Sequence, residues 1–320
     1  MKQHGWEKPN SFSETVRLVE NLVEQQIVRE TAQKQLYYHT IEHANSVKRR
    51  AIRIFQAIDS VVVNEGLSIE SNRLQSLIEL CAMSHDMVQD FSLADKHQIP
   101  RKRIPGVSET ATVEKLFEYI EHLNRALPID LNSSILFNDL DLAIIEDAIM
   151  ATVCELDPQA GKAVYSFSSH SIYQPYLYNS QPKTSIAGNI IALADLGTLG
   201  IDGIEPYIRE GILVFVEDNL DIKNFILNCN YPNSLDRGEI KNRFLKMARF
   251  IVNLARERKA RFELEIAGFC PKARQILREE VFIHLTQENI EKIEAIVPTN
   301  EDVSLTELID FFCSNNNLER

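Results

Sequence analysis

Apolar residues recur every three or four positions along most of the chain, which is the pattern of amphipathic α-helices. Between residues 13 and 35, for example, Val16, Val19 and Val23 share this spacing. Only residues 212–216 resemble a strand, and they lie inside a longer helical pattern. We therefore predict an all-α protein. The period predicts helices over 13–35, 39–58, 68–88, 108–127, 139–154, 184–199, 207–227, 235–266, 274–293 and 305–312.

Two long stretches, 90–105 and 157–182, lack this period and contain prolines. Loops of this length inside a compact domain are often functional lids or binding loops. The turn-forming sequence at 230–234 predicts a boundary between two parts of the chain. We expect a main helical domain over residues 11–230 and a helical C-terminal extension over 231–320, which would serve as a lid, a dimer surface or a partner surface.

The chain is acidic, with 46 Asp and Glu against 34 Lys and Arg and a net charge of −12. Because this field repels phosphate, the composition disfavours long nucleic acids and anionic membranes as partners. Apolar runs are shorter than the roughly 18 residues of a membrane span, and the first residues lack the apolar stretch of a secretory signal. We therefore predict a cytoplasmic protein. Its five dispersed cysteines are typical of reduced thiols.

Three short segments contain residues that could form a chemical site. His39 and His43 are four residues apart, so on a helix both could point at one centre, although such pairs are also common on surfaces and in cores. His85 and Asp86 close an apolar helical stretch, where both would be costly to bury without bonded partners or a metal. Asp195 stands alone in an apolar helical stretch, where it is either a surface or capping residue or the partner of a cation.

In their order along the chain, these segments resemble the HD-domain superfamily of metal-dependent phosphohydrolases, whose all-helical core carries the pattern H…HD…D. The segment YHTIEHANSV looks like the YHNxxHxxxV form of the first motif, and ALADLGTLG is similar to the last motif of bacterial members. The resemblance covers about residues 36–200, which is half of the chain. It implies an HD-type helical bundle that hydrolyses a phosphate ester.

The resemblance also implies roles for individual residues. His43, His85, Asp86 and Asp195 would ligate a divalent metal, and His39 would protonate the leaving oxygen. Imidazole and carboxylate together suit Mn, Fe, Co, Ni or Zn. We expect one tightly held metal, with Mg possible at a second site bridged by Asp86, which makes Asp86 a catalytic residue as well. Glu109 is a candidate for orienting water, although a carboxylate at a helix start explains it equally well.

Basic residues near these motifs are candidates for binding the substrate phosphate. Arg101, Lys102 and Arg103 follow the His-Asp motif, and Arg50 follows the first histidines. Such clusters attract phosphate locally in an acidic protein, but the cluster around Arg50 is also typical of a solvated helix face.

We therefore expect a metal-dependent phosphomonoesterase or phosphodiesterase that acts on a small anionic phosphate ester, a nucleotide in the first instance. The protein could also form homo-oligomers. Two alternatives stay open. One is a non-catalytic HD module that senses a nucleotide. The other is a hydrolase of the alarmone (ppGpp) type, because HDMVQD partly resembles the HDxxED of those enzymes.

Overall fold

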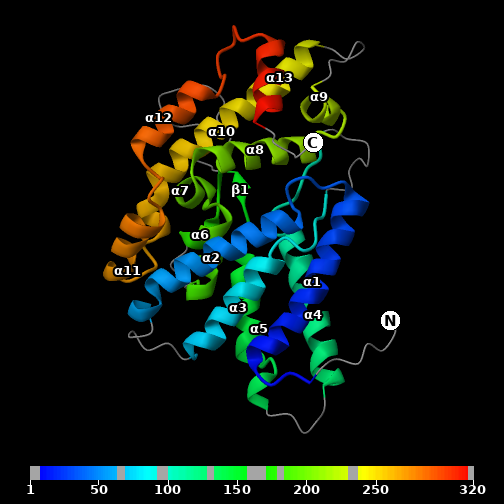
Figure 1. The fold of residues 1–320 in the computed structure, drawn as a ribbon, viewed down its shortest axis with the longest axis vertical. Coiled ribbons are helices and arrows are strands. Elements are labelled where there is room, and N and C mark those ends of the chain that lie inside the picture. Colours follow the sequence, from blue (N-terminus) through cyan, green and yellow to red (C-terminus); the bar gives the residue numbers. More distant parts are fainter. Residues whose placement is uncertain are drawn as a thin grey trace.

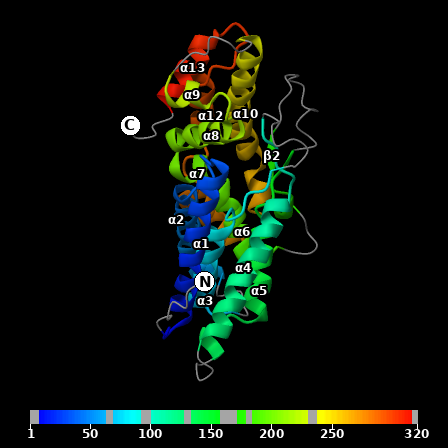
Figure 2. The same cartoon turned by 90° about the vertical axis from the view of Figure 1, so that its right-hand side faces the viewer.

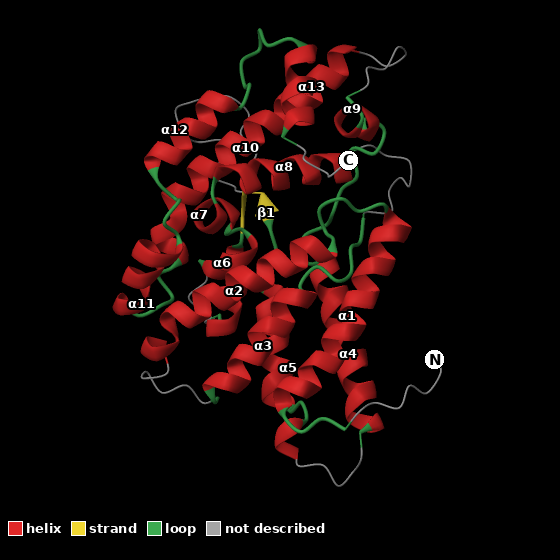
Figure 3. Ribbon diagram, in the orientation of Figure 1, coloured by secondary structure: helices red, strands yellow, loops and turns green. Residues whose placement is uncertain are grey.

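The computed structural model describes residues 8–62, 69–91, 100–127, 133–156, 171–178, 184–229 and 237–315. Helices dominate these residues, which confirms the all-α prediction (Figure 3). The α-helices are α1 (Phe12–Lys34), α2 (Ile41–Val62), α3 (Ser71–Ser84), α4 (Val107–Ala126), α5 (Asp139–Met150), α6 (Ile186–Asp195), α7 (Thr198–Asp202), α8 (Ile204–Asp218), α9 (Lys223–Leu227), α10 (Arg237–Glu265), α11 (Pro271–Ile276), α12 (Gln287–Ile296) and α13 (Leu305–Ser314).

The other elements are short. They are two 3-10 helices, η2 (Ser133–Ile135) and η3 (Pro175–Leu177), a π-helical turn, η4 (Leu277–Val281), and two strands, β1 (Glu155–Leu156) and β2 (Ile172–Tyr173). The strands pair antiparallel, with Glu155 opposite Tyr173. They lie within or beside the long stretch 157–182, of which residues 157–170 and 179–183 fall outside the described residues.

The helices form two groups along the long axis of the molecule (Figures 1 and 2). Helices α1 to α6 make up the lower group, in which α2 packs on α3 and α6. Helices α8, α9, α10, α12 and α13 make up the upper group. Each group has its own hydrophobic core. The site described below lies where elements of both groups meet.

The two cores do not divide at the predicted boundary near residue 230. Residues of α8 and α9, such as Ile212 and Ile226, belong to the core of the C-terminal helices. Conversely, Phe262 and Ile266, at the end of α10 and just after it, pack into the core of α1 to α6. The turn-forming sequence at 230–234 itself lies outside the described residues. The C-terminal segment is therefore packed against both halves of the molecule.

Several predicted helices have different limits in the structure. Helix α2 begins at Ile41, so His39 lies in the turn before it. The helix predicted over 184–199 is interrupted after Asp195, where Gly197 lies so close to the Leu193 carbonyl that a side chain would collide with it. The helix predicted over 274–293 is broken by η4 and a turn before α12, and the helix predicted over 207–227 is divided into α8 and α9. The first two changes place His39 and Asp195 at helix ends, where their side chains reach the same site.

None of the described helices has the length and apolarity that a membrane span requires. All five cysteines lie in the described residues and are free thiols, as the sequence predicted. Between α7 and α8, Gly203 adopts a φ of 97°, which a side chain would disfavour. Helix α8 follows this turn and lies beside α7, above α2 in Figure 1.

Candidate metal centre

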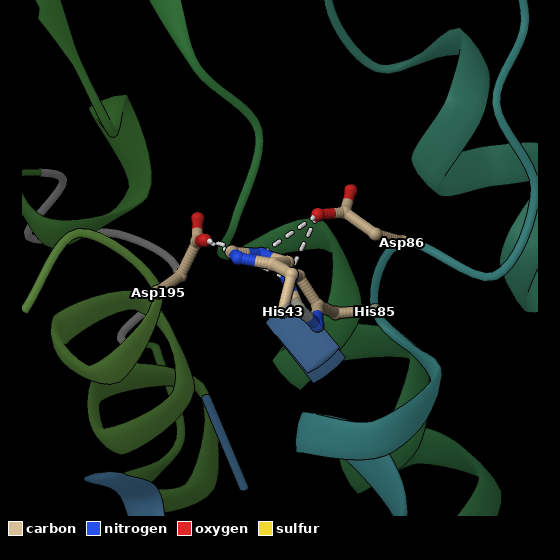
Figure 4. A group of neighbouring side chains, drawn as sticks. All are labelled: His43, His85, Asp86 and Asp195. Carbon is tan, nitrogen blue, oxygen red and sulfur yellow. Dashed lines mark ion pairs between the residues drawn. The ribbon is translucent and has the colours of Figure 1, made fainter. Parts of the chain in front are cut away.

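Four side chains from three segments of the lower group converge on one point (Figure 4). His43 comes from the first turn of α2, His85 and Asp86 follow the end of α3, and Asp195 is the last residue of α6. The two imidazole rings lie between the two carboxylates. One potential ligand atom from each residue lies within 4.8 Å of all the others. This spacing is that of ligands around a single metal ion.

The distances within the cluster are longer than those of ordinary hydrogen bonds, with one exception. His43 Nε2 lies 3.4 Å from Asp86 Oδ2 and 3.6 Å from Asp195 Oδ1. His85 Nε2 lies 2.9 Å from Asp86 Oδ2 and 3.5 Å from Asp195 Oδ1. Each imidazole nitrogen therefore faces both carboxylates, and the space between the four groups is small.

The unpaired nitrogens of this cluster fit a bound metal. The Nδ1–H of His85 donates to the backbone oxygen of Ala82 at 2.9 Å, so that Nε2 carries a lone pair. His43 Nε2 and His85 Nε2 are buried and make no hydrogen bond of good geometry among the described residues, although His85 Nε2 lies 2.9 Å from Asp86 Oδ2, and His43 Nδ1 has no partner there either. Buried polar atoms without partners are costly, and metal-ligating histidines usually donate their other N–H to a carbonyl or carboxylate. The donor set of two imidazoles and two carboxylates suits a divalent transition metal.

The ionisable groups of the cluster shift one another's pKa values. Burial alone would raise the pKa of Asp86 and of Asp195, but the surrounding imidazoles lower both pKa values. Burial alone would lower the pKa of His43 and of His85, but the two carboxylates raise both. The two buried carboxylates therefore favour positive charge between them, which protonated imidazoles supply and which a divalent cation bound to neutral imidazoles would supply instead.

Two glutamines hold the carboxylates in place. Gln174, just after β2, donates to Asp195 Oδ2 at 3.1 Å. Gln89 donates to Asp86 Oδ1 at 3.0 Å and accepts a hydrogen bond from Arg103 at 2.9 Å. Both glutamines are 1% exposed. The orientation of each carboxylate is therefore fixed by a buried donor, as is usual for the outer partners of metal ligands.

His39 stands beside the cluster and is oriented by Glu217 of α8. His39 Nε2 lies 3.7 Å from Asp86 Oδ2, and His39 Nδ1 lies 2.5 Å from Glu217 Oε1. Because a carboxylate only accepts, Nδ1 carries the proton and Nε2 faces the cluster. The other oxygen of Glu217 accepts the backbone N–H groups of Tyr37, Tyr38 and His39 at 2.9, 2.8 and 3.1 Å.

Glu217 is fully buried, yet it remains ionised. Burial alone would raise the pKa of its carboxyl group, but the charge and hydrogen bond of His39, the Arg103 guanidinium and the backbone donors lower it well below the ordinary value. The carboxylate thus fixes the backbone just before α2 and the His39 ring at the same time. It also explains why α2 begins later than its apolar period predicts, since the N–H groups of residues 37–39 are directed to Glu217.

A cavity of about 310 Å³ opens beside the cluster. Asp86, Asp195, His39 and Glu109 line it. Burial raises the pKa of Glu109, and the nearby charges of Asp86 and Asp195 raise it further. The volume is at the lower end of the range for small-molecule sites. The cavity brings together two of the four predicted ligands, the predicted acid and the predicted water-orienting residue.

Of the four basic residues predicted to bind phosphate, only Arg103 lines this cavity. It pairs with Glu217 and with Asp218, the latter at 2.9 Å. Arg101 instead donates to the backbone carbonyls of Lys34, Gln35 and Glu217. Lys102 is exposed to solvent.

Arg50 is neither a solvated residue nor a lining residue of the cavity. Its side chain is fully buried and contacts Thr198, Asp202 and Glu210, with distances of 3.2 and 3.1 Å to the two carboxylates. These partners come from α7 and α8, which cover this face of α2. Arg50 therefore links α2 to α7 and α8.

Some residues of the site lie outside the sequence motifs. They are Glu217, Gln174 and the residues of α8 and α10 that line the cavity. Glu217 carries a signal of the kind that marked Asp195, because it is a carboxylate next to an apolar run at 212–216. Gln174 and Arg258, a cavity-lining residue of α10, carry no such local signal. Their proximity to the cluster follows from tertiary packing alone.

Comparisons with protein-family models, with curated proteins and with solved structures gave no match for this chain.

Proposed function

We propose that this protein is a metal-dependent phosphohydrolase that acts on a small phosphate ester, in the first instance a nucleotide. The observation that carries the proposal is the position of His39. Its Nε2 lies 3.7 Å from Asp86 Oδ2, beside four convergent ligands and on the same cavity. A metal cluster alone serves structure or binding as well as catalysis, whereas an adjacent imidazole with its second nitrogen held by a carboxylate is suited to proton transfer. The resemblance of the motifs to HD-domain phosphohydrolases supports the same activity.

The residues that would hold the metal are His43, His85, Asp86 and Asp195. A divalent ion bound there would lower the pKa of a coordinated water and neutralise charge that develops on the phosphoryl oxygens. A metal ion that takes more than four ligands would still have room for water or a phosphate oxygen beside these four residues. The donor set favours Mn, Fe, Co, Ni or Zn, and does not decide between them.

His39 would act as the general acid. As the bond between phosphorus and the leaving oxygen breaks, that oxygen needs a proton, which Nε2 of the imidazolium supplies. Glu217 stabilises the imidazolium through Nδ1 and keeps Nε2 directed at the cavity. Because Glu217 is itself fixed by three backbone donors, the acid is held in place before the substrate binds.

Glu109 and Arg103 complete the set. Glu109 lies at the start of α4 and lines the cavity, and its raised pKa suits a group that orients the attacking water and accepts its proton. Arg103 lines the cavity and pairs with Glu217 and Asp218. Because these two carboxylates already compensate its charge, Arg103 would hold Glu217 in place at the edge of the cavity rather than bind the substrate phosphate.

The test begins with the metal. Purified protein is analysed for bound transition metals, together with His85→Ala and Asp86→Ala. We expect close to one tightly bound equivalent in the wild type and its loss in both variants. Hydrolysis of p-nitrophenyl phosphate, of bis-p-nitrophenyl phosphate and of a panel of nucleotides is then measured with each candidate metal.

His39→Gln separates catalysis from binding. This variant keeps all four ligands, so we expect it to retain the metal and to lose hydrolysis by about a hundredfold or more. Glu42→Gln, which changes an exposed residue of the same segment, is the matched control. Absence of bound metal from the wild type would refute the proposal. Metal and nucleotide binding without hydrolysis of any substrate would instead favour a sensing module.

A further inference from the structure

Residues of α8 and α10 form one wall of the cavity. Val214 of α8 and Phe250 and Leu254 of α10 line it with apolar side chains. The two helices approach closely because α8 has a glycine at position 211, where an added Cβ would lie 2.9 Å from Ile251. A substrate that fills the cavity would therefore place part of its surface against the C-terminal segment.

One buried cation lines this cavity on α10. Arg258 is 3% exposed and pairs with Glu265 of the same helix at 2.6 Å. Glu265 is 1% exposed and also accepts the hydroxyl of Tyr178 at 2.8 Å. The guanidinium is thus anchored on one side by a carboxylate that is itself fixed. Glu265 is its only ion-pair partner among the residues that the structure describes.

The anchoring decides which kind of group Arg258 would recognise. Because Glu265 already compensates its charge, a second anion placed there would be repelled by that buried carboxylate. A neutral pair of acceptors meets no such repulsion, and the planar guanidinium offers donors in a fixed fork. The apolar wall formed by Val214, Phe250 and Leu254 suits a flat ring better than a second, strongly hydrated phosphate.

We propose that Arg258 recognises the base of a 6-oxopurine nucleoside monophosphate through the O6 and N7 acceptors of the purine. Arginine binds this pair of acceptors with two parallel hydrogen bonds, whereas adenine offers a donor in place of O6. The cavity of about 310 Å³ holds one nucleotide rather than two. This inference rests on the proposed function, because it places the phosphate of the same molecule at the metal centre.

The test compares substrates with and without the base. Values of kcat/KM are measured for guanosine monophosphate, adenosine monophosphate and p-nitrophenyl phosphate with wild type and with Arg258→Lys. The lysine keeps the ion pair with Glu265 but loses the fork. We expect the wild type to prefer the guanine nucleotide, and the variant to lose about ten- to a hundredfold on that substrate with less than a twofold change on p-nitrophenyl phosphate. Arg256→Lys alters an exposed arginine two residues earlier on the same helix. It should change kcat/KM for neither substrate.

Binding measurements separate this inference from the proposed function. Calorimetric titration of guanosine monophosphate into the metal-loaded wild type, into Arg258→Lys and into His39→Gln does not depend on hydrolysis. Binding that weakens in Arg258→Lys but persists in His39→Gln supports base recognition, even if no substrate is hydrolysed. A wild type without preference between the two nucleotides, or an equal loss on all substrates in Arg258→Lys, overturns the proposal. Thermal unfolding of Arg258→Lys shows whether an equal loss comes from misfolding, and a folded variant with that result is decisive against base recognition.

Discussion

Glu217 Oε1 lies 2.5 Å from His39 Nδ1, and through this contact a residue of α8 sets the direction in which His39 faces the His-Asp cluster. The same carboxylate accepts three successive backbone N–H groups just before α2. One buried charge therefore fixes both the main chain and the ring of the proposed acid. The arrangement also links the upper group of helices to the site in the lower group.

Replacing Glu217 with Gln should reduce hydrolysis without releasing the metal. An amide can donate to Nδ1, which favours the tautomer whose proton lies on Nε2, and it does not stabilise the imidazolium. We expect kcat to fall by about a hundredfold or more, as for other histidines that lose an orienting carboxylate. The metal content should be unchanged, because Glu217 contacts none of the four ligands. Activity close to that of the wild type would show that His39 is not oriented by this contact.

Glu205→Gln is the matched control for this measurement, because Glu205 lies on the same helix and is exposed. It removes the same charge from α8 without touching His39. A comparable loss of activity in both variants would point to the charge of the helix and not to the contact with His39.

Glu217 should also contribute a pH-dependent part of the stability. The pKa of its carboxyl group is lowered in the folded protein by His39, Arg103 and backbone donors, against the opposing effect of burial. A lowered folded pKa stabilises the protein fully above the unfolded pKa, about 4.3, and this stabilisation is lost as the pH falls toward the folded pKa. The difference in free energy of unfolding between wild type and Glu217→Gln should therefore be constant from about pH 6 to 7 and shrink below about pH 4.3. Urea unfolding at a series of pH values measures it, and a difference that grows on acidification would contradict the assignment.

The sequence predicted the helices well where apolar residues recur without interruption, as in α1 and α10. It failed where one local contact ends a helix. Helix α6 ends at Asp195, two residues before Gly197, where only a glycine can lie so close to the Leu193 carbonyl, and the π-helical turn η4 precedes the break before α12. Such breaks leave the apolar period intact, so periodicity alone does not reveal them.

The residues of the site also fall into two groups, those that short sequence motifs reveal and those that only tertiary packing brings to the site. His39, His43, His85 and Asp86 lie in short motifs whose spacing is visible in the sequence, and the structure brings them together with Asp195. Glu217 comes from a distant segment, so only the packing of α8 against the residues just before α2 reveals its role. The basic residues near the motifs show the converse error. Nearness in sequence suggested phosphate contacts for Arg50, whereas its position on α2 directs it into the interface with α7 and α8.

Replacing Arg50 with Met should therefore affect stability before it affects substrate binding. Removing the guanidinium leaves the carboxylates of Asp202 and Glu210 without a buried partner, which costs roughly 3–5 kcal/mol. The neighbouring Arg49 also pairs with Asp202, but its side chain is 57% exposed, and Arg49→Met should cost at most about 1 kcal/mol. Urea unfolding of the two variants measures the difference. Equal stability with a raised KM in Arg50→Met would restore the phosphate-binding role.

Removing the buried donor to Asp195 should weaken the metal site without removing a ligand. Gln174 donates to Asp195 Oδ2 at 3.1 Å, and its own amide oxygen has no hydrogen-bond partner among the described residues. Gln174→Leu therefore frees Asp195 and discards an unsatisfied acceptor at nearly constant volume. We expect metal affinity to fall by about ten- to a hundredfold, as for other partners of metal ligands. Competition against a chromophoric chelator measures the metal affinity. The thermal stabilisation that added metal gives should decrease in parallel, since binding to the folded state alone raises stability.

Gln287→Leu, on the exposed start of α12, should leave both the metal affinity and the thermal stabilisation unchanged. Unaltered affinity in Gln174→Leu would mean that Asp195 is held by the fold of α6 alone or is not a metal ligand, and the metal content of Asp195→Ala distinguishes these two cases.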